Sequence, residues 1–227
     1  MSQIRYTSRA LIFLVVPRIF MTRNNILMKK IILIGGGGHC KSCVDVIENE
    51  KKYKIVGIVD KKNKNFSLLN YSVFPESYFY KKLVKNNHAF ITVGQIKNYK
   101  IRVELFNKLR NLGFKIPFIV SPLAYISKHA IIGQGTIVMH GAIINAGAVI
   151  GNNCIINTNS LIEHDVKIGD HTHISTEATI NGGVLIGDKV FIGSRSVIKN
   201  NITIGDCSIV GAHQYVKKNL NKNSLKK

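Results

Sequence analysis

Isoleucine or valine occupies every sixth position in the second half of the chain, from Ile126 to Val216, sixteen times without a miss. The next residue is often Gly, Asn or Ser, and the fifth place of the hexad is usually small, as at Ala142 and Ser160. A six-residue period with apolar, small and turn-permissive places is typical of a parallel β-helix built from hexapeptides. An α-helical period does not produce this spacing. The pattern therefore predicts a β-helix domain over residues 121–219.

The first half alternates short apolar runs with helical periods. Residues 31–34 predict a strand, 35–38 a glycine turn, the apolar-periodic stretch through Val44 and Ile47 a helix, and 55–59 a second strand that ends at Asp60. Glycines before a helix let the backbone approach a phosphate, and an acid after the second strand can accept from a ribose hydroxyl. A third strand and a further helix follow, over 90–93 and about 100–112, the helix with an apolar stripe of Ile101, Leu105, Leu109 and Leu112. We therefore predict a Rossmann-like domain over residues 28–120, too short for a full dinucleotide fold and better suited to a smaller nucleotide.

The formal net charge of +20 is concentrated in this first domain, where residues 28–120 carry 18 basic and 6 acidic side chains. A basic domain suits polyanions such as nucleic acid, anionic lipid, nucleotide sugars or coenzyme A. The lysines are scattered singly and in pairs, however, which is also typical of an ordinary solubilising surface. We expect no nucleic-acid partner, and we interpret residues 220–227 as a basic tail.

Residues 1–27 resemble a weak signal peptide, because two arginines precede the apolar run from Ala10 to Val16. The run has no small-x-small cleavage site and is far shorter than the roughly 20 residues of a membrane-spanning helix. Because Met28 opens directly into a strand, we interpret 1–27 as a leader outside the native protein and predict no membrane span. N-terminal sequencing of the natural protein tests this, since an intact residue 1 would contradict it.

The four cysteines lack the dense spacing of a disulfide framework, which favours a reducing, cytoplasmic location. Cys40 and Cys43 match the C-x-x-C redox spacing just after a strand. Val44 and Ile47 continue an apolar helix pattern there, so we interpret both cysteines as small buried side chains.

The stretch NTNSLIEHDVKIGDHTH, residues 157–173, holds three histidines. The hexads resemble those of left-handed β-helix acyltransferases, in which three hexads make one coil and residues eighteen apart stack. In that register His164 and Asp165 project at a corner between Ala146-Gly147 and Gly182-Gly183, a notch that could leave backbone N–H groups free for a substituent. His171 and His173 lie at another corner and on another face, which argues against a metal site within one chain. We predict that His171 is ordinary surface.

A chain with a glycine turn followed by a hexapeptide prism resembles the sialic acid O-acetyltransferase (NeuD) family of sugar acetyltransferases. That family includes the N-acetyltransferase of bacillosamine synthesis. The resemblance covers residues 29–219, and its motifs are IILIGGGGH, ITVGQIK and INTNSLIEHDVKIGDHTHIS. It implies an α/β Rossmann-like domain followed by a left-handed parallel β-helix, and a homotrimer.

The same resemblance implies roles for particular residues. His164 is the expected general base and Asp165 the acid that raises its basicity. The implied acetyl-CoA contacts are His173, Gly182, Ser194 and Ala212. The implied nucleotide-sugar contacts are Gly37, Gly38, His39, Asp60 and Gly94. The acid after His164 is Glu in the bacillosamine enzyme, and Lys61 stands where that enzyme has a second acid, so the acceptor and the nucleotide stay open.

We therefore predict an acetyl-CoA-dependent acetyltransferase that acts on a sialic acid or a nucleotide-linked amino sugar for a bacterial surface glycan, with no metal. Two alternatives remain. Carbonic anhydrases on this β-helix bind zinc through histidines of adjacent subunits, although they lack a comparable front domain. A non-catalytic nucleotide-binding scaffold would bind ligands without turnover.

Overall fold

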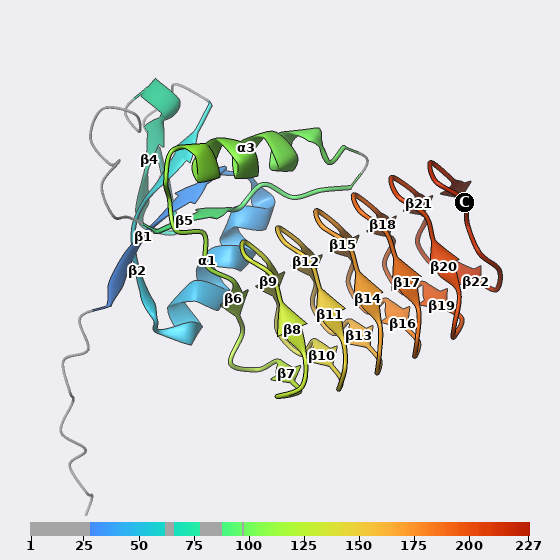
Figure 1. Ribbon diagram of the computed structural model, residues 1–227. Helices are drawn as coiled ribbons and strands as arrows, with labels where there is room; N and C mark the ends of the chain where they lie inside the picture. Colours follow the sequence, from blue (N-terminus) through green and yellow to red (C-terminus); the bar gives the residue numbers. More distant parts are fainter. Residues whose placement is uncertain (1–27, 62–65, 78–87, 97) are drawn as a thin grey trace, which may run out of the picture.

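The hexads wind into a three-sided prism (Figure 1). The apolar residue of each hexad packs inside it, and these residues form one continuous core. The computed structural model describes residues 28–61, 66–77, 88–96 and 98–227, so the predicted leader lies outside the described residues. Residues eighteen apart pair as parallel strands, as Ile155 does with His173. The predicted parallel β-helix after an α/β domain is confirmed.

The prism has three sheets of two-residue strands. Sheet 1 contains β6 (Ile119–Val120), β9 (Ile137–Val138), β12 (Ile155–Ile156), β15 (His173–Ile174), β18 (Phe191–Ile192), β21 (Ile209–Val210) and β23 (Leu225–Lys226). Sheet 2 contains β7 (Tyr125–Ile126), β10 (Ile143–Ile144), β13 (Leu161–Ile162), β16 (Thr179–Ile180), β19 (Val197–Ile198) and β22 (Tyr215–Val216). Sheet 3 contains β8 (Ile131–Ile132), β11 (Val149–Ile150), β14 (Lys167–Ile168), β17 (Leu185–Ile186) and β20 (Thr203–Ile204). We name the corners edge 1–2, edge 2–3 and edge 3–1 after the sheets that they join.

The corners turn through left-handed backbone. Every sixth residue from Gly135 to His213 has a positive φ, and most of these residues are not glycine. Asp165 is one of them, with φ of 60°. Asn and Asp tolerate this region better than other side chains, and a hydrogen bond from each such N–H to the preceding coil supports it, as from Asp165 to the Ala146 carbonyl at 3.1 Å.

The coils extend past both predicted boundaries. β6 begins before residue 121, and β23 lies within the predicted basic tail, where it pairs with β21. In this last coil Ile209 pairs with Leu225, sixteen residues away instead of eighteen. The shorter spacing breaks the hexad rule, which is why the pattern does not reveal this coil.

The first domain is a five-stranded sheet with a helix on each face. The strand order is β3 (Phe66–Leu68), β4 (Tyr71–Pro75), β2 (Tyr53–Asp60), β1 (Lys29–Ile34) and β5 (His88–Ile91), with only β3 antiparallel to its neighbour. Helix α1 (Gly38–Glu50) lies between this sheet and sheet 1 of the prism, and its buried residues share a core cluster with Ile137, Met139 and Ile155. Helix α3 (Lys100–Asn111) covers the other face. The first domain therefore docks on sheet 1 and leaves edge 2–3 on the far side of the prism.

Both cysteines of the C-x-x-C spacing are buried in α1, and burial raises the pKa of the Cys40 and Cys43 thiols. The four cysteines are free thiols. Among the described residues, no helix has the length and apolarity needed to cross a membrane.

Candidate active site

His164 and Asp165 form a hydrogen-bonded pair on edge 2–3. The His164 Nδ1 atom lies 2.9 Å from Asp165 Oδ2, and the two side chains are 64% and 73% exposed. A carboxylate can only accept, so in this pair Nδ1 donates its proton and Nε2 keeps the lone pair. The arrangement holds an imidazole in the tautomer that a general base at Nε2 requires.

Glycines in the adjoining coils make room for both side chains. A Cβ added at Gly182 would lie 2.6 Å from His164 Nε2, and one added at Gly147 would lie 2.4 Å from Asp165 Oδ1. The imidazole therefore leans over the later coil and the carboxylate over the earlier one. The predicted notch exists, but the Gly183 N–H donates to the His164 carbonyl at 3.0 Å, so this amide is not free for a substituent. This N–H makes one of the backbone hydrogen bonds that join successive coils.

The glycine turn and Asp60 meet at the carboxyl ends of β1 and β2. The Gly36 N–H donates to Asp60 Oδ2 at 2.6 Å, which orients the carboxylate. A Cβ at Gly37 or Gly38 would meet no atom within 4 Å, and α1 begins there without a side-chain cap. No side chain caps the start of the helix and the turn beside it has open space, an arrangement that suits a phosphate.

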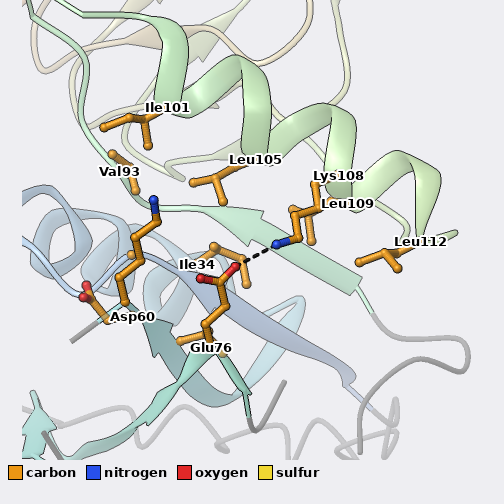
Figure 2. A pocket seen from close by; sticks show the side chains of 12 residues that line it. Ile34, Asp60, Glu76, Val93, Ile101, Leu105, Lys108, Leu109 and Leu112 are labelled. Carbon is orange, nitrogen blue, oxygen red and sulfur yellow. Dashed lines mark hydrogen bonds and ion pairs between the residues drawn. The ribbon is translucent and has the colours of Figure 1, made fainter. Parts of the chain in front are cut away.

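A cavity of about 210 Å³ adjoins this turn (Figure 2). Its walls are mostly apolar side chains of α3 and of the strand ends, with the Lys108–Glu76 ion pair, 2.7 Å between Nζ and Oε1, on one side. The residues that line it are Ile34, Gly35, Val59, Asp60, Lys61, Glu76, Val93, Ile101, Leu105, Lys108, Leu109 and Leu112. An apolar slot beside an acid and a helix N-terminus can take the flat base and the ribose of a nucleotide.

The predicted α3 stripe thus lines this cavity, while the buried face of the helix is Arg102, Phe106 and Leu109. Arg102 was missed because an arginine is not expected in a core. It lies four residues before Phe106 and seven before Leu109, and this spacing is the signal that could have found it.

The predicted acetyl-CoA residues do not converge within one chain. Gly182 lies beneath His164 on edge 2–3, whereas Ser194 and Ala212 lie on edge 1–2. The Ser194 hydroxyl is 2.9 Å from that of Ser175, and Ala212 is exposed. His173 lies on sheet 1, where it is only 6% exposed. One chain therefore presents two separate parts of the predicted site.

Among the described residues, no group of three or more His, Cys, Asp or Glu side chains could hold a metal ion.

Both halves of the chain match known families. Residues 30–109 match the PglD N-terminal domain, and residues 129–164 and 147–182 match the six-repeat bacterial transferase hexapeptide. The UDP-N-acetylbacillosamine N-acetyltransferase of Bacillus subtilis (strain 168) is 36% identical over 117 residues, 49% of this chain and 52% of that protein. The match thus spans about half the length of that curated relative.

Solved structures match over more of the chain. PerB from Caulobacter crescentus, in complex with CoA and GDP-perosamine, is 28% identical with a TM-score of 0.80 over 86% of this chain and 92% of its own. The acetyltransferase domain of PglB from Neisseria gonorrhoeae, in complex with acetyl coenzyme A, is 28% identical with a TM-score of 0.80, over 87% of this chain and 95% of its own. These matches support an acetyltransferase of the PglD/NeuD-like family. The family resemblance seen in the sequence is confirmed.

The predicted site residues His39 and His173 lie at the junction between the two domains. His39 packs beside Gly94, whose added Cβ would lie 3.5 Å from the His39 Cβ, and His39 Nε2 is buried without a hydrogen-bond partner among the described residues. His173 donates from Nδ1 to the Gln95 carbonyl and accepts at Nε2 from Asn157 at 3.1 Å. Both ring nitrogens of His173 are thus occupied by the protein.

The prediction that His171 is ordinary surface is wrong. Its ring lies edge-on to Phe106 of α3 at 5.5 Å, and Nδ1 is 2.9 Å from Asn153 Nδ2. Burial lowers the pKa of His171. The hexad register places His171 at a corner, but edge 3–1 is the corner that α3 covers.

The sequence did not reveal a second contact between the two domains, which His140 makes. His140 Nε2 lies 2.7 Å from Asp45 Oδ2 of α1, and its Nδ1 lies 2.7 Å from Ser121 Oγ. Because the carboxylate accepts, Nε2 donates to Asp45 and Nδ1 accepts from Ser121. Since Ser121 is 1% exposed, this arrangement fastens α1 to the prism instead of offering a nucleophile.

The junction histidines predict acid sensitivity of the fold. Burial is the main reason that the pKa of His173 falls to about 4 and that of His39 to about 3, with Arg102 adding to both. The unfolded chain binds these protons near pH 6.5 and the folded chain does not, so stability present above about pH 6.5 is lost as pH falls toward 4. His173 alone accounts for about 3 kcal/mol of this loss. Urea unfolding at several pH values measures it, and His173→Gln should flatten the curve; an equally steep fall in that variant would contradict the assignment.

Proposed function

We propose that the protein transfers an acetyl group from acetyl-CoA to an amino group of a nucleotide-linked amino sugar, for a bacterial surface glycan. The observation that carries the proposal is the His164–Asp165 pair, which aims a lone pair at the space above Gly182. The glycine turn, Asp60 and the adjoining cavity supply a nucleotide site. N-acetylation is favoured over O-acetylation because the similar PerB was solved with an amino-sugar nucleotide and CoA, and the curated relative is an N-acetyltransferase.

The proposed chemistry needs no covalent enzyme intermediate. The amine nitrogen attacks the thioester carbonyl carbon, and His164 Nε2 takes a proton from that nitrogen as the N–C bond forms. The C–S bond then breaks, and the thiolate of CoA leaves with a proton from the imidazolium. Asp165 stabilises the imidazolium through Nδ1. Such proton transfer contributes roughly 10²- to 10⁴-fold to the rate, and holding both ligands together supplies much of the rest.

We further propose that the active enzyme is a homotrimer whose sites form between chains. In the early coils, outward side chains of the same hexad place are buried on sheet 1, as Ile137 is by the first domain, but exposed on sheets 2 and 3. Tyr125 is 58% exposed on sheet 2, and Ile131 is 63% exposed on sheet 3. These apolar faces flank edge 2–3, so a second copy can cover them and bring its edge 1–2, with Ser194 and Ala212, to His164. Light scattering of the active enzyme should give a trimer, and a fully active monomer would contradict it.

The experiment that tests the function is acetyl-CoA turnover with matched acceptors. UDP-, GDP- and CMP-linked sugars that carry either an amino group or a hydroxyl at the same carbon, and free sialic acid, are each incubated with the purified protein. We expect thiol release only with one nucleotide and only with the amino sugar, and an N-acetylated product by mass spectrometry. Turnover with hydroxyl acceptors alone would replace N- with O-acetylation. Ligand binding without turnover across the panel would favour the scaffold alternative, and stoichiometric zinc with carbon dioxide hydration would favour the carbonic anhydrase.

We also propose a cytoplasmic location, which the free thiols of the described residues support.

The close approach of His164 to Gly182 gives a specific prediction. In Gly182→Ala the new methyl group would occupy the place of the imidazole, so His164 must rotate away. Because the obstacle is a flexible side chain, the fold should survive while kcat falls roughly ten- to hundredfold. The matched control is Asn200→Ala, exposed one coil later on the same edge, which should keep wild-type kcat. Wild-type kcat in Gly182→Ala would show that the observed ring position is not the active one.

A further inference from the structure

The segment between β5 and α3, residues 92–96, begins inside the nucleotide site. Thr92 is fixed to the glycine turn, because its hydroxyl donates to the Gly35 carbonyl at 2.6 Å. Val93 lines the cavity, and Gly94 lies against His39. A nucleotide in the cavity would therefore press on this segment directly.

The next residue, Gln95, holds the segment to the prism at two points. Its side-chain Nε2 donates to the His171 carbonyl at 2.7 Å, and its backbone carbonyl accepts from His173 Nδ1. Gln95 is 3% exposed, whereas its neighbour Ile96 is 64% exposed. One buried residue thus joins the wall of the cavity to sheet 1.

The hydrogen bonds continue from His173 to edge 1–2. The Nδ1 atom of His173 donates its hydrogen bond to the Gln95 carbonyl, so Nε2 is the acceptor, and it accepts from Asn157 Nδ2 at 3.1 Å. Asn157 Oδ1 in turn accepts from the Thr158 N–H at 2.8 Å. Thr158 stands in the same column of edge 1–2 as Ser194 and Ala212, which are the residues implied to contact acetyl-CoA. Both ring nitrogens of His173 thus have a partner, so this series of hydrogen bonds fixes its ring.

Arg102 provides a parallel connection. Its Nη1 donates to the Val93 carbonyl at 2.6 Å and its Nη2 to Asn153 Oδ1 at 2.7 Å, while Asn153 contacts His171. Residues on both sides of Gly94 are thus bound to the prism. A displacement of the cavity wall by a ligand must be shared by His173.

We infer that Gln95 is a positioning residue that couples nucleotide binding in the first domain to acyl-donor binding on edge 1–2. This inference rests on the proposed function. A ligand at either site biases the position of segment 92–96 against the prism, and the hydrogen bonds of Gln95 pass this bias on, so the second ligand meets the arrangement that it needs and binds more tightly. The coupling is reciprocal by linkage.

Calorimetric titration of the full-length protein with CoA tests the inference, without nucleotide and with saturating UDP or GDP as probes. In the wild type we expect the nucleotide that binds to tighten CoA binding about fivefold or more. In Gln95→Ala, and in Gln95→Met, which keeps the volume but has no donor, the ratio should fall about twofold or more toward one, because the backbone hydrogen bond to His173 and the Arg102 connection remain. The affinity of each ligand alone should stay within about threefold of wild type. Ile96→Ala is the matched control and should keep the wild-type ratio.

Three results would overturn the inference. These are independent binding of the two ligands to the wild type, an unchanged ratio in both Gln95 variants, and the same loss in Ile96→Ala. A loss of CoA affinity in the variants without nucleotide would also contradict it, because a merely structural role would produce that result. The proposed function fails separately, if neither UDP nor GDP nor any other nucleotide of the acceptor panel binds at all.

Discussion

Replacing His164 with alanine should lower kcat for acetyl transfer by roughly 10²- to 10⁴-fold, the contribution of a general base. The KM for each substrate should change little, because the side chain is expected to act on the proton and not to hold either ligand. Among the described residues the imidazole is hydrogen-bonded only to Asp165, and it is 64% exposed, so its loss should leave the thermal midpoint almost unchanged. Steady-state thiol release and a melting curve measure the two effects together.

His129→Ala is the matched control for this prediction. His129 is exposed on the same edge 2–3, two coils before the pair, and its side chain has no assigned role. We expect wild-type kcat in this variant. Undiminished turnover in His164→Ala would remove His164 as the base, and an equal loss in His129→Ala would show that the edge matters for assembly and not for proton transfer.

Replacing Arg102 with methionine should destabilise the protein by about 3 kcal/mol. The guanidinium is fully buried and donates to the carbonyls of Ile91, Val93 and Asn153. Methionine fills much of the same volume but donates nothing, so buried acceptors lose their partners at a cost of roughly 1–3 kcal/mol each, partly offset by no longer burying a charge. Burial lowers the pKa of Arg102 to about 10, the direction expected when a cation is removed from water.

Differential scanning calorimetry measures this effect as a fall in the transition midpoint. Arg110→Met is the control, because Arg110 lies on the same helix, is exposed, and only stacks over Phe106 at 5.8 Å. It should change the stability by less than about 0.5 kcal/mol. A midpoint in Arg102→Met equal to that of the control would mean that water replaces the lost donors.

The hexad register was enough to predict the prism and the notch of small residues around His164 and Asp165, since both follow from residues eighteen apart stacking on each other. It could not predict which face the first domain covers. The outward hexad place is apolar on all three sheets, as Ile131, Ile137 and Ile143 illustrate, and only tertiary packing distinguishes them. The error about His171 has this origin, because a corner residue is exposed or buried according to its neighbour.

The contacts at the junction between the domains could not be predicted from the sequence for a related reason. Gln95, Arg102 and Asn153 are polar residues that belong in a core only because each satisfies the others, and such mutual satisfaction is invisible until the segments meet. A motif of glycines and an acid, in contrast, carries its own local geometry. Asp60 and the turn at Gly36 were for this reason placed correctly beside each other.

The unbroken repeat between Ile126 and Val216 also restricts how a chain of this kind can change its length. Loss or gain of six residues would rotate everything downstream by one third of a turn and carry Ser194 from one edge to another, whereas eighteen residues would return it to its own edge one coil away. Related proteins and engineered variants that keep the same activity should therefore differ in length by whole coils in this region. Single-residue insertions should be tolerated only at the last coil, where the spacing is already irregular.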